Sequence, residues 1–261
     1  GTDTVQAGVS YTLGANVEHL TLTGSAAING TGNTADNILD GSQNSAANTL
    51  AGGAGNDTYV VGAGDSVVEN ANEGTDTVQS NVTWVLGNDV ENLTLTGAAA
   101  IDGTGNAANN MLAGNSADNV LTGLGGDDTY QYTSGGGQDT VVDNSGAADR
   151  LEFGTGIDPL DLILSRMAND LRLSVSGTTD AVTIKDWYTS PTTNQVETIL
   201  AGNGQDLLNS EVDQLIQAMA QFTTDTGLSW DAAAAGSGTA QQQADFQAIV
   251  ANGWQTTIIL S

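Results

Sequence analysis

The residues best suited to chemistry in this sequence lie in the run GGAGNDTYV, from Gly52 to Val60. Its glycines allow sharp turns with positive φ and leave backbone carbonyl oxygens exposed at Gly52, Gly53 and Gly55. Asp57 adds a carboxylate to these oxygens, and a hard cation such as Ca²⁺ takes six to eight oxygen ligands. The last three residues predict a short strand with Tyr59 facing inward. The run therefore predicts a site for a hard cation beside a buried strand.

The charge distribution also favours cations as partners. The formal net charge is −27, and 18 of the 31 acidic residues lie in residues 1–149. No Lys or Arg occurs in that stretch, because all four basic residues follow it: Arg150, Arg166, Arg172 and Lys185. Carboxylates on strands stacked about 4.8 Å apart repel by roughly 3–4 kcal/mol at an effective dielectric near 20. Multivalent cations reverse that repulsion, whereas nucleic acids and anionic membranes add to it.

The remaining composition narrows the classes of protein further. The chain has no Cys, so neither disulfides nor thiol chemistry can contribute. No apolar run approaches the roughly 20 residues that a membrane span needs, and we expect none. The N-terminal GTD has no Met and matches Gly74-Thr75-Asp76 inside the chain. We therefore expect the sequence to be part of a longer protein, with a further domain upstream of Gly1.

An internal repeat of about 73 residues organises the first part of the chain. TDTVQ at Thr2–Gln6 returns at Thr75–Gln79, and VEHLTLTG at Val17–Gly24 returns as VENLTLTG at Val90–Gly97. GGAGNDTY at Gly52–Tyr59 returns as GLGGDDTY at Gly123–Tyr130. Self-similarity at a fixed period is typical of a solenoid.

Within each unit a shorter period of about ten residues repeats, and each ten-residue segment consists of a polar turn followed by a short strand. If two such segments make one coil of a parallel β-roll, alternate turns lie on the same edge. We therefore expect Asn37, Asp57 and Asp76 to stack on one edge, as Asn110, Asp128 and Asp149 do in the second unit. Asn119 and Asp139 would share the opposite edge. The inward residues predicted from this ten-residue period are Leu39, Leu50, Tyr59, Val67 and Val78, then Leu112, Leu121, Tyr130, Val141 and Leu151.

Residues 1–153 resemble the repeats-in-toxin (RTX) family of haemolysin-type calcium-binding proteins. The resemblance is specific at Gly52–Val60, and it extends with departures to GLGGDDTYQ at Gly123–Gln131 and SGGGQDTVV at Ser134–Val142. It implies a right-handed parallel β-roll that binds several Ca²⁺ ions. The remaining calcium positions expected on this basis are Gly74 and Asp76, Gly123, Gly126 and Asp128, Gly135, Gly137 and Asp139, and Asp149. At Asn37, Asn48, Asn110 and Asn119 an amide replaces the acid, which leaves open whether these turns bind metal or bond to their own turn.

The resemblance also implies how the protein is exported and where it folds. Members of this family leave the bacterial cell through a type I secretion apparatus, which reads an uncleaved C-terminal signal, and fold where calcium is plentiful. We therefore expect a secreted protein, extracellular or at the cell surface. A narrow roll buries little apolar surface per residue, so each bound ion, worth roughly 2.7 kcal/mol at 100 times its dissociation constant, could decide whether it folds.

The glycine-turn rhythm ends near Gly154. Residues 154–208 predict a β-rich cap with strands at Leu162–Ser165, Leu171–Val175, Ala181–Trp187 and Val196–Leu200. Within it, DLRLSVSGTTDAVTIKDWY resembles the region that often follows haemolysin-type repeats. Residues 209–261 predict a helical and apolar end. A helix is expected over Asn209–Phe222 with Ser210 as its N-cap, and another over Thr239–Val250. The terminal WQTTIILS resembles a type I secretion signal, although an edge strand packed on the cap fits equally.

No catalytic set is evident, and any catalytic domain would lie upstream of this chain. The single His, His19, is replaced by Asn92 in the second unit, so it is a poor candidate for unique chemistry. Two LTLT runs, at Leu20–Thr23 and Leu93–Thr96, open an alternative in which threonine faces bind ice or sugars. A related alternative is a calcium-stiffened spacer in a large adhesin. A long, uninterrupted threonine ladder would favour surface recognition.

Overall fold

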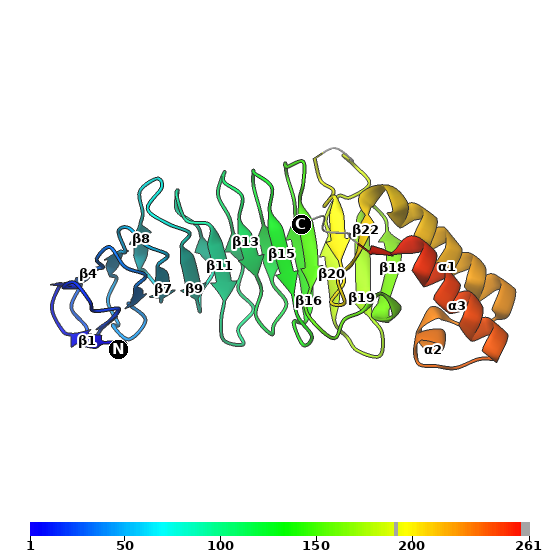
Figure 1. Cartoon of the computed structure of the whole chain (residues 1–261), viewed down its shortest axis with the longest axis horizontal. Coiled ribbons are helices and arrows are strands. Elements are labelled where there is room, and N and C mark those ends of the chain that lie inside the picture. The colour runs from blue at the N-terminus through cyan, green and yellow to red at the C-terminus, as the bar shows by residue number, and fades with distance from the viewer. Residues whose placement is uncertain (191–192, 257–261) are drawn as a thin grey trace.

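The computed structural model describes residues 1–190 and 193–256, and it is an elongated parallel β-solenoid with a helical C-terminal end (Figure 1). From β1 to β17 the chain alternates between two faces, so that odd-numbered strands stack on one side and even-numbered strands on the other. Successive strands of one face lie one coil apart, as in the pairing of Leu39 with Tyr59 and of Tyr59 with Val78. The all-β roll that the repeat predicts is therefore confirmed.

The odd-numbered strands form a continuous sheet along the whole molecule. In sheet order they are β1 (Thr4–Ala7), β3 (His19–Leu22), β5 (Ile38–Asp40), β7 (Thr58–Val61), β9 (Thr77–Ser80), β11 (Asn92–Leu95), β13 (Met111–Ala113), β15 (Thr129–Tyr132), β17 (Arg150–Phe153) and β21 (Thr198–Leu200), followed by β22 (Gln205–Leu208) and β23 (Gln255–Thr256).

The opposite face is divided into two sheets between β8 and β10. The first contains β2 (Tyr11–Thr12), β4 (Asn29–Thr31), β6 (Thr49–Ala51) and β8 (Ser66–Val68). The second contains β10 (Trp84–Val85), β12 (Gly103–Thr104), β14 (Val120–Thr122), β16 (Gln138–Val142) and β20 (Ala181–Ile184), with β19 (Asp170–Val175) and β18 (Leu162–Met167) at its end.

The core is a column of apolar side chains inside the coils. Leu39, Tyr59 and Val78 stand in register and are fully buried, and Leu112 and Tyr130 repeat the arrangement in the second unit. Of the ten inward residues expected from the sequence, nine are buried and the tenth, Val67, is half-buried. Because one or two side chains per half-coil fill this space, the metal-free solenoid has a narrow hydrophobic core.

Residues beyond Gly154 continue the solenoid before they cover its end. Strand β20 pairs in parallel with β16, and β21 pairs in parallel with β17. Between β17 and β20 along the chain, β18 and β19 form an antiparallel hairpin that pairs with β20. The strands expected at Leu162–Ser165, Leu171–Val175, Ala181–Trp187 and Val196–Leu200 are thus present, although the third ends at Ile184 and the fourth begins at Thr198.

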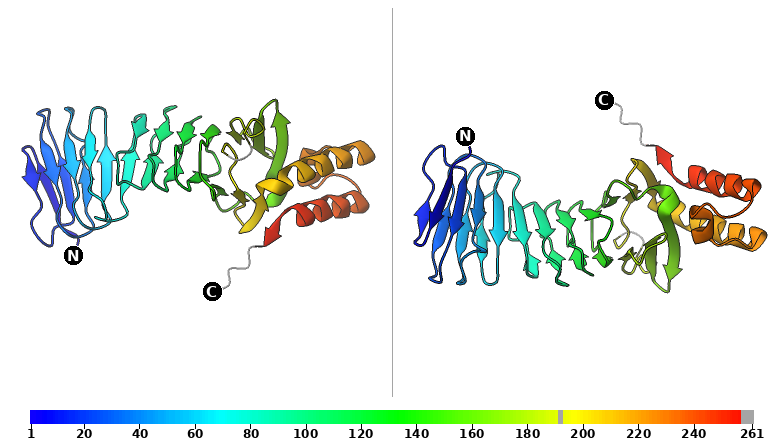
Figure 2. Two further views of the ribbon diagram at one scale, coloured as in Figure 1. Left: turned by 90° about the horizontal axis from the view of Figure 1, so that it is seen from above. Right: turned by 90° about the horizontal axis from the view of Figure 1, so that it is seen from below.

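Three α-helices follow, α1 (Val212–Thr226), α2 (Trp230–Ala234) and α3 (Ala240–Gly253), together with the short 3₁₀ turns η1 (Pro159–Asp161) and η2 (Asn209–Glu211). Figure 2 shows α1 and α3 side by side at the far end of the molecule. Thr239 caps α3 in a capping box with Gln242. The expected cap at Ser210 is wrong, because η2 contains Ser210 and the α-helix begins only at Val212.

Helix α2 was not expected from the sequence, and its Trp230 packs between Phe222 of α1 and Phe246 of α3. The ring centroids of Trp230 and Phe246 are 4.6 Å apart, so α2 anchors the two longer helices to each other. None of the helices in residues 1–190 and 193–256 is long and apolar enough to cross a membrane. Of the terminal WQTTIILS, residues 257–261 lie outside the described residues.

The threonine faces are interrupted. Thr21 and Thr94, from the two LTLT runs, stand in the same outward column of the odd-numbered sheet. Between them, the strand register places Asp40, Val60 and Gln79 in that column. A charged and an apolar residue therefore interrupt the threonine column that joins the two LTLT runs.

Candidate metal centres

A ladder of carboxylates follows one edge of the solenoid. Asp57 and Asp76 directly precede β7 and β9, and parallel pairing of these strands brings the two turns together. The backbone N–H of Asn37 donates to Asp57 Oδ1 at 2.7 Å, and the N–H of Asp57 donates to Asp76 Oδ1 at 2.8 Å. The N–H of Asp76 in turn donates to Glu91 Oε2 at 2.7 Å. The stacking expected for Asn37, Asp57 and Asp76 is confirmed, and Glu91 adds a fourth rung.

The second repeat unit builds the same ladder. The N–H of Asn110 donates to Asp128 Oδ1 at 2.8 Å, and the N–H of Asp128 donates to Asp149 Oδ1 at 2.6 Å. The N–H of Asp149 donates to Glu197 Oε2 at 2.8 Å. Glu197 takes the place that Glu91 has in the first unit, but it lies after the β18–β19 hairpin. The last rung of the roll therefore comes from the C-terminal region.

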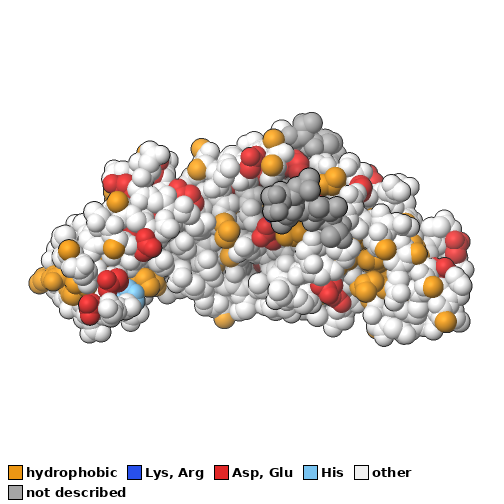
Figure 3. Space-filling view, viewed as in Figure 1, with side chains coloured by type: hydrophobic (Ala, Val, Ile, Leu, Met, Phe, Trp, Pro, Cys, Tyr) orange, Lys and Arg blue, Asp and Glu red, His pale blue; other side chains and the backbone are white. Residues whose placement is uncertain are grey.

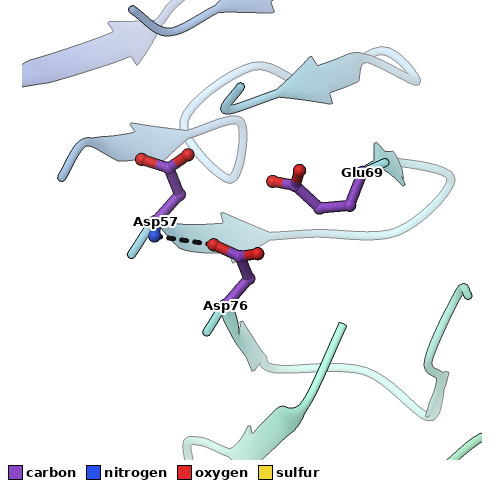
Figure 4. Close-up of side chains that lie close together, drawn as sticks. All are labelled: Asp57, Glu69 and Asp76. Atoms are coloured by element: carbon purple, nitrogen blue, oxygen red, sulfur yellow. Dashed lines mark hydrogen bonds between the residues drawn. The ribbon is translucent and has the colours of Figure 1, made fainter. Parts of the chain in front are cut away.

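Each ladder brings three acidic side chains close together. Asp57, Glu69 and Asp76 have ligand oxygens within 4.8 Å of one another, and we call them the first acidic cluster (Figure 4). Glu69 follows β8 directly and extends its carboxylate toward the two turn aspartates. Asp57 Oδ2 and Glu69 Oε2 are buried and have no hydrogen-bond partner.

The second acidic cluster consists of Asp128, Asp143 and Asp149, again within 4.8 Å of one another. All three are buried, with exposed fractions of 0%, 2% and 1%. Each has one carboxylate oxygen, Oδ2, without a hydrogen-bond partner. Three buried and incompletely paired carboxylates in contact are costly without a counter-charge, because both desolvation and mutual repulsion oppose ionisation.

A tyrosine hydroxyl adjoins each cluster. Tyr59, one residue beyond the turn of β7, donates to Glu69 and accepts a hydrogen bond from the N–H of Gly52 at 2.7 Å. Tyr130 is placed in the same way in the second unit and donates to Asp143 Oδ1 at 3.2 Å. The inward residue of the nonapeptide thus fills the core with its ring and reaches the acids with its hydroxyl.

The motif glycines serve two physical purposes. Gly53 and Gly55 have φ values of 90° and 119°, in the left-handed region that the sequence predicts. Gly52 is required for a different reason: a Cβ there would overlap Asp57 Oδ2 and the Tyr59 hydroxyl. A Cβ at Gly123 would likewise overlap Asp128 Oδ2, and one at Gly74 would overlap the carbonyl oxygen of Gly55. Leu124, which replaces the second motif glycine, adopts a φ of 79°.

Burial dominates the electrostatics of these acids. Burial raises the pKa of Asp57 to about 6 and that of Glu69 to about 8, and the neighbouring acids raise both further, whereas backbone hydrogen bonds act against the rise. The pKa of Asp128 is raised to about 7 by burial and by the charge of Asp149, against the hydrogen bond from Asn110. Burial likewise raises the pKa of Asp149, and the adjacent Asp143 adds to it. Without a cation each cluster therefore keeps part of its protons at neutral pH.

The protein itself offers these clusters no positive charge. Within residues 1–190 and 193–256, ion pairs form only between Arg150 and Glu152 and between Lys185 and Asp170. Acidic side chains are scattered along the face of the molecule in Figure 3. A hard cation such as Ca²⁺ fits the donor set, which consists of carboxylate and hydroxyl oxygens. It would supply the missing counter-charge to the unpartnered oxygens.

The expected calcium residues on the opposite edge have a simpler setting. Gly135 and Gly137 both have a φ of 81°, and Asp139 accepts a hydrogen bond from the N–H of Asn119 at 2.9 Å. Burial raises the pKa of Asp139 to about 7. No third acid joins Asp139 in a cluster among the described residues. Asp139 and Asn119 share this edge as predicted, and calcium binding there stays a prediction.

Hydrogen bonds satisfy three of the four asparagine turns; Asn48 donates to the carbonyl oxygen of Ile28, but its Oδ1 is buried without a partner. Asn37 Oδ1 accepts from the N–H of Asn33 in its own turn, and Asn33 Nδ2 donates to the carbonyl oxygens of Gly14 and Val17 in the preceding coil. Asn106 and Asn110 repeat this arrangement in the second unit. Side-chain amides thus link adjacent coils at these turns. Of the two interpretations left open by the sequence, the hydrogen-bonded turn matches these contacts.

Sequence analysis missed Glu69 and Asp143, because neither lies in the nonapeptide. A signal was present: VVEN at Val67–Asn70 and VVDN at Val141–Asn144 follow equivalent strands in the two units. An acid placed directly after a buried strand, at equivalent points of a repeat, indicates a side chain at the coil edge. That comparison would have identified both residues.

One comparison with known proteins bears on the C-terminal region. Residues 170–200 match the model of the haemolysin-type calcium binding protein related domain. The matched stretch spans β19, β20 and β21, and it includes Glu197, the last rung of the second ladder. Together with the parallel β-solenoid and its repeated acidic turns, this match fits an RTX calcium-binding repeat protein.

Proposed function

We propose that this chain is a calcium-binding RTX β-roll that folds when calcium fills its acidic turns. The observation that supports this most strongly is the second acidic cluster, where three buried carboxylates each have an oxygen without a partner. Calcium would convert the repulsion among them into attraction. Because the apolar core is narrow, the free energy of ion binding forms a large part of the stability of the roll.

The setting of this module is proposed from its family resemblance. The protein is exported by a type I secretion apparatus while calcium is scarce, and the roll folds outside the cell. Extracellular calcium modules typically have dissociation constants of about 10⁻⁴–10⁻³ M, which matches such a switch. In this scheme the module covers or displays an effector domain upstream, and any catalytic activity belongs to that domain. The secretion signal would lie in the C-terminal segment, residues 209–261.

A second candidate role is a calcium-stiffened spacer in a large extracellular protein. The long stack of coils in Figure 1 is suited to this, because ions bound along one edge would resist bending of the roll. The two roles share the calcium chemistry and differ in what the neighbouring domains do. Small-angle scattering of the chain fused to its neighbours, with and without calcium, separates a rigid rod from a compact unit in which the roll packs against the effector.

The test of the shared chemistry is a calcium titration of chelated protein followed by far-ultraviolet circular dichroism. We expect a cooperative gain of β-structure or of melting temperature at millimolar to sub-millimolar calcium, and a much smaller one with magnesium, which prefers a smaller octahedral site. Asp57→Ala and Asp139→Ala then report on the two edges separately. An unchanged signal and unchanged melting temperature in calcium would refute the proposal.

A further inference from the structure

We infer that Glu69 and Asp143, together with the hydroxyls of Tyr59 and Tyr130, complete two repeat-related cation sites that extend beyond the nonapeptide turns. The ligand is a hard cation of calcium size, either Ca²⁺ or a trivalent lanthanide, which shares the preference for oxygen. The inference rests on the proposed calcium binding and adds the residues that close each site. Neither Glu69 nor Asp143 belongs to the glycine-rich motif.

Unpartnered oxygens point to a ligand at both sites. Asp57 is 1% exposed, and its Oδ2 has no hydrogen-bond partner although its Oδ1 accepts from Asn37. In the second site Asp143 is 2% exposed, and its Oδ2 is likewise without a partner while its Oδ1 accepts from Tyr130. Each acid thus uses one oxygen to hold its position within the protein. The other oxygen has no partner in the protein, and each acid brings a carboxylate oxygen within 4.8 Å of its neighbours in the cluster.

The arrangement is reproduced with a different side chain in each unit. Glu69 has one more methylene than Asp143, yet both bring an oxygen within 4.8 Å of the two turn aspartates. Each also receives a hydrogen bond from the tyrosine of the preceding odd-numbered strand, β7 or β15. Random clustering of acids in an acidic protein would not reproduce three carboxylates and a hydroxyl at equivalent points. The common feature of the two units is the oxygen cage rather than the residue type.

The loop that carries Glu69 provides a matched control. Glu73 lies in the same loop, is also half-buried, and accepts hydrogen bonds from Asn70, but it is outside the first acidic cluster. Glu69→Gln and Glu73→Gln remove the same charge from the same loop. Only the first removes an oxygen anion from the proposed site.

The experiment uses terbium bound to the whole chain, with emission sensitised by the tyrosines beside each site. Calcium competes with terbium, which gives calcium affinity, and calorimetry gives the number of ions. We expect Glu69→Gln and Asp143→Asn each to weaken one site at least about tenfold or to remove one ion, and the double variant to affect both. Glu73→Gln should weaken binding much less than Glu69→Gln, because Glu73 acts on the first acidic cluster only through its charge and offers it no ligand oxygen. Tyr59→Phe and Tyr130→Phe should each remove the sensitised emission of one site.

A conservative exchange guards against misfolding of the Asn variant. Asp143→Glu restores the side chain found at the equivalent point of the first unit and should retain the ion. If wild-type protein binds calcium and both Glu69→Gln and Asp143→Asn bind it unchanged, the extended sites are refuted while the proposed function stands. If wild-type protein binds neither calcium nor terbium, the proposed function itself fails.

Discussion

Replacing Asp143 by Asn should stabilise the calcium-free protein and destabilise the calcium-bound one. Asp143 is 2% exposed and accepts a hydrogen bond from the Tyr130 hydroxyl at 3.2 Å. The Asn side chain has nearly the same shape, and its Oδ1 can accept the same bond. The substitution therefore removes one negative charge from the second acidic cluster and leaves packing almost unchanged.

The magnitude follows from the spacing of the cluster. The oxygens of the cluster lie within 4.8 Å of one another, and two ionised carboxylates at that limit repel by about 3.5 kcal/mol at an effective dielectric near 20. The raised pKa of Asp128, about 7, shows that bound protons already relieve part of this repulsion at neutral pH. We expect the calcium-free variant to gain about 1–2 kcal/mol in free energy of unfolding. At 100 times the dissociation constant it should lose the roughly 2.7 kcal/mol that one ion supplies.

The assay is thermal unfolding of wild type and variant in chelator and in saturating calcium. Asp102→Asn is the control, because Asp102 is exposed, lies outside both clusters, and accepts a backbone hydrogen bond from Val120 that Asn can also accept. The control should shift little in either condition. A variant that is destabilised equally with and without calcium would refute the view that Asp143 faces unpaired charges.

Three further predictions concern other parts of the structure. Leu124→Gly should stabilise the protein by about 0.5–1.5 kcal/mol in urea unfolding, because a 42% exposed Leu is held at a φ of 79°. Gly53→Ala should destabilise it, because Gly53 has a φ of 90°. Loss of stability in Leu124→Gly would show that the contacts of the Leu124 side chain outweigh the backbone strain. Asn106→Ala should lower the free energy of unfolding by about 2–4 kcal/mol equally with and without calcium, since the amide donates to two carbonyl oxygens and accepts from Ala108. Asn109→Ala, at an exposed position, should lower it less. A loss that depends on calcium would contradict this prediction. The melting temperature of calcium-free protein should fall as pH rises from about 5 to 8, because the clustered acids have a folded pKa above the unfolded value and the native state therefore binds more protons. The melting temperature of calcium-loaded protein should rise over the same range, because protons stop competing with the ion. Parallel pH profiles in the two conditions would refute the assignment.

The roll could be predicted from the sequence alone because its inward and turn residues recur at a regular spacing. A parallel stack aligns each residue with one a coil away, so the spacing of Leu39, Tyr59 and Val78 fixes both the core and the edge. Once those residues face inward, Asp57 and Asp76 must meet at the start of neighbouring strands. The shared edge of the turn acids could therefore be worked out without coordinates.

Other parts depend on packing that no short pattern encodes. Glu69 joins Asp57 because β8 ends beside the β7 turn, a relation between strands on opposite faces of the roll. Ser210 has the residue type of a helix cap, but the chain leaving β22 first makes a 3₁₀ turn, so the α-helix starts only at Val212. Tertiary contacts decide such boundaries, and local propensity is a weak guide to them.

Asparagine turns and acidic turns hold successive coils together in different ways. Asn33 and Asn106 place amide donors against carbonyl oxygens of the preceding coil, which gives those oxygens a partner without any ion. The acidic turns place carboxylates there instead and leave oxygens unpartnered. The coils around the asparagine turns should hence persist without calcium, while the two acidic clusters respond to it. Because Glu197 of the C-terminal region ends the second ladder, the calcium response should be strongest where the roll meets that region.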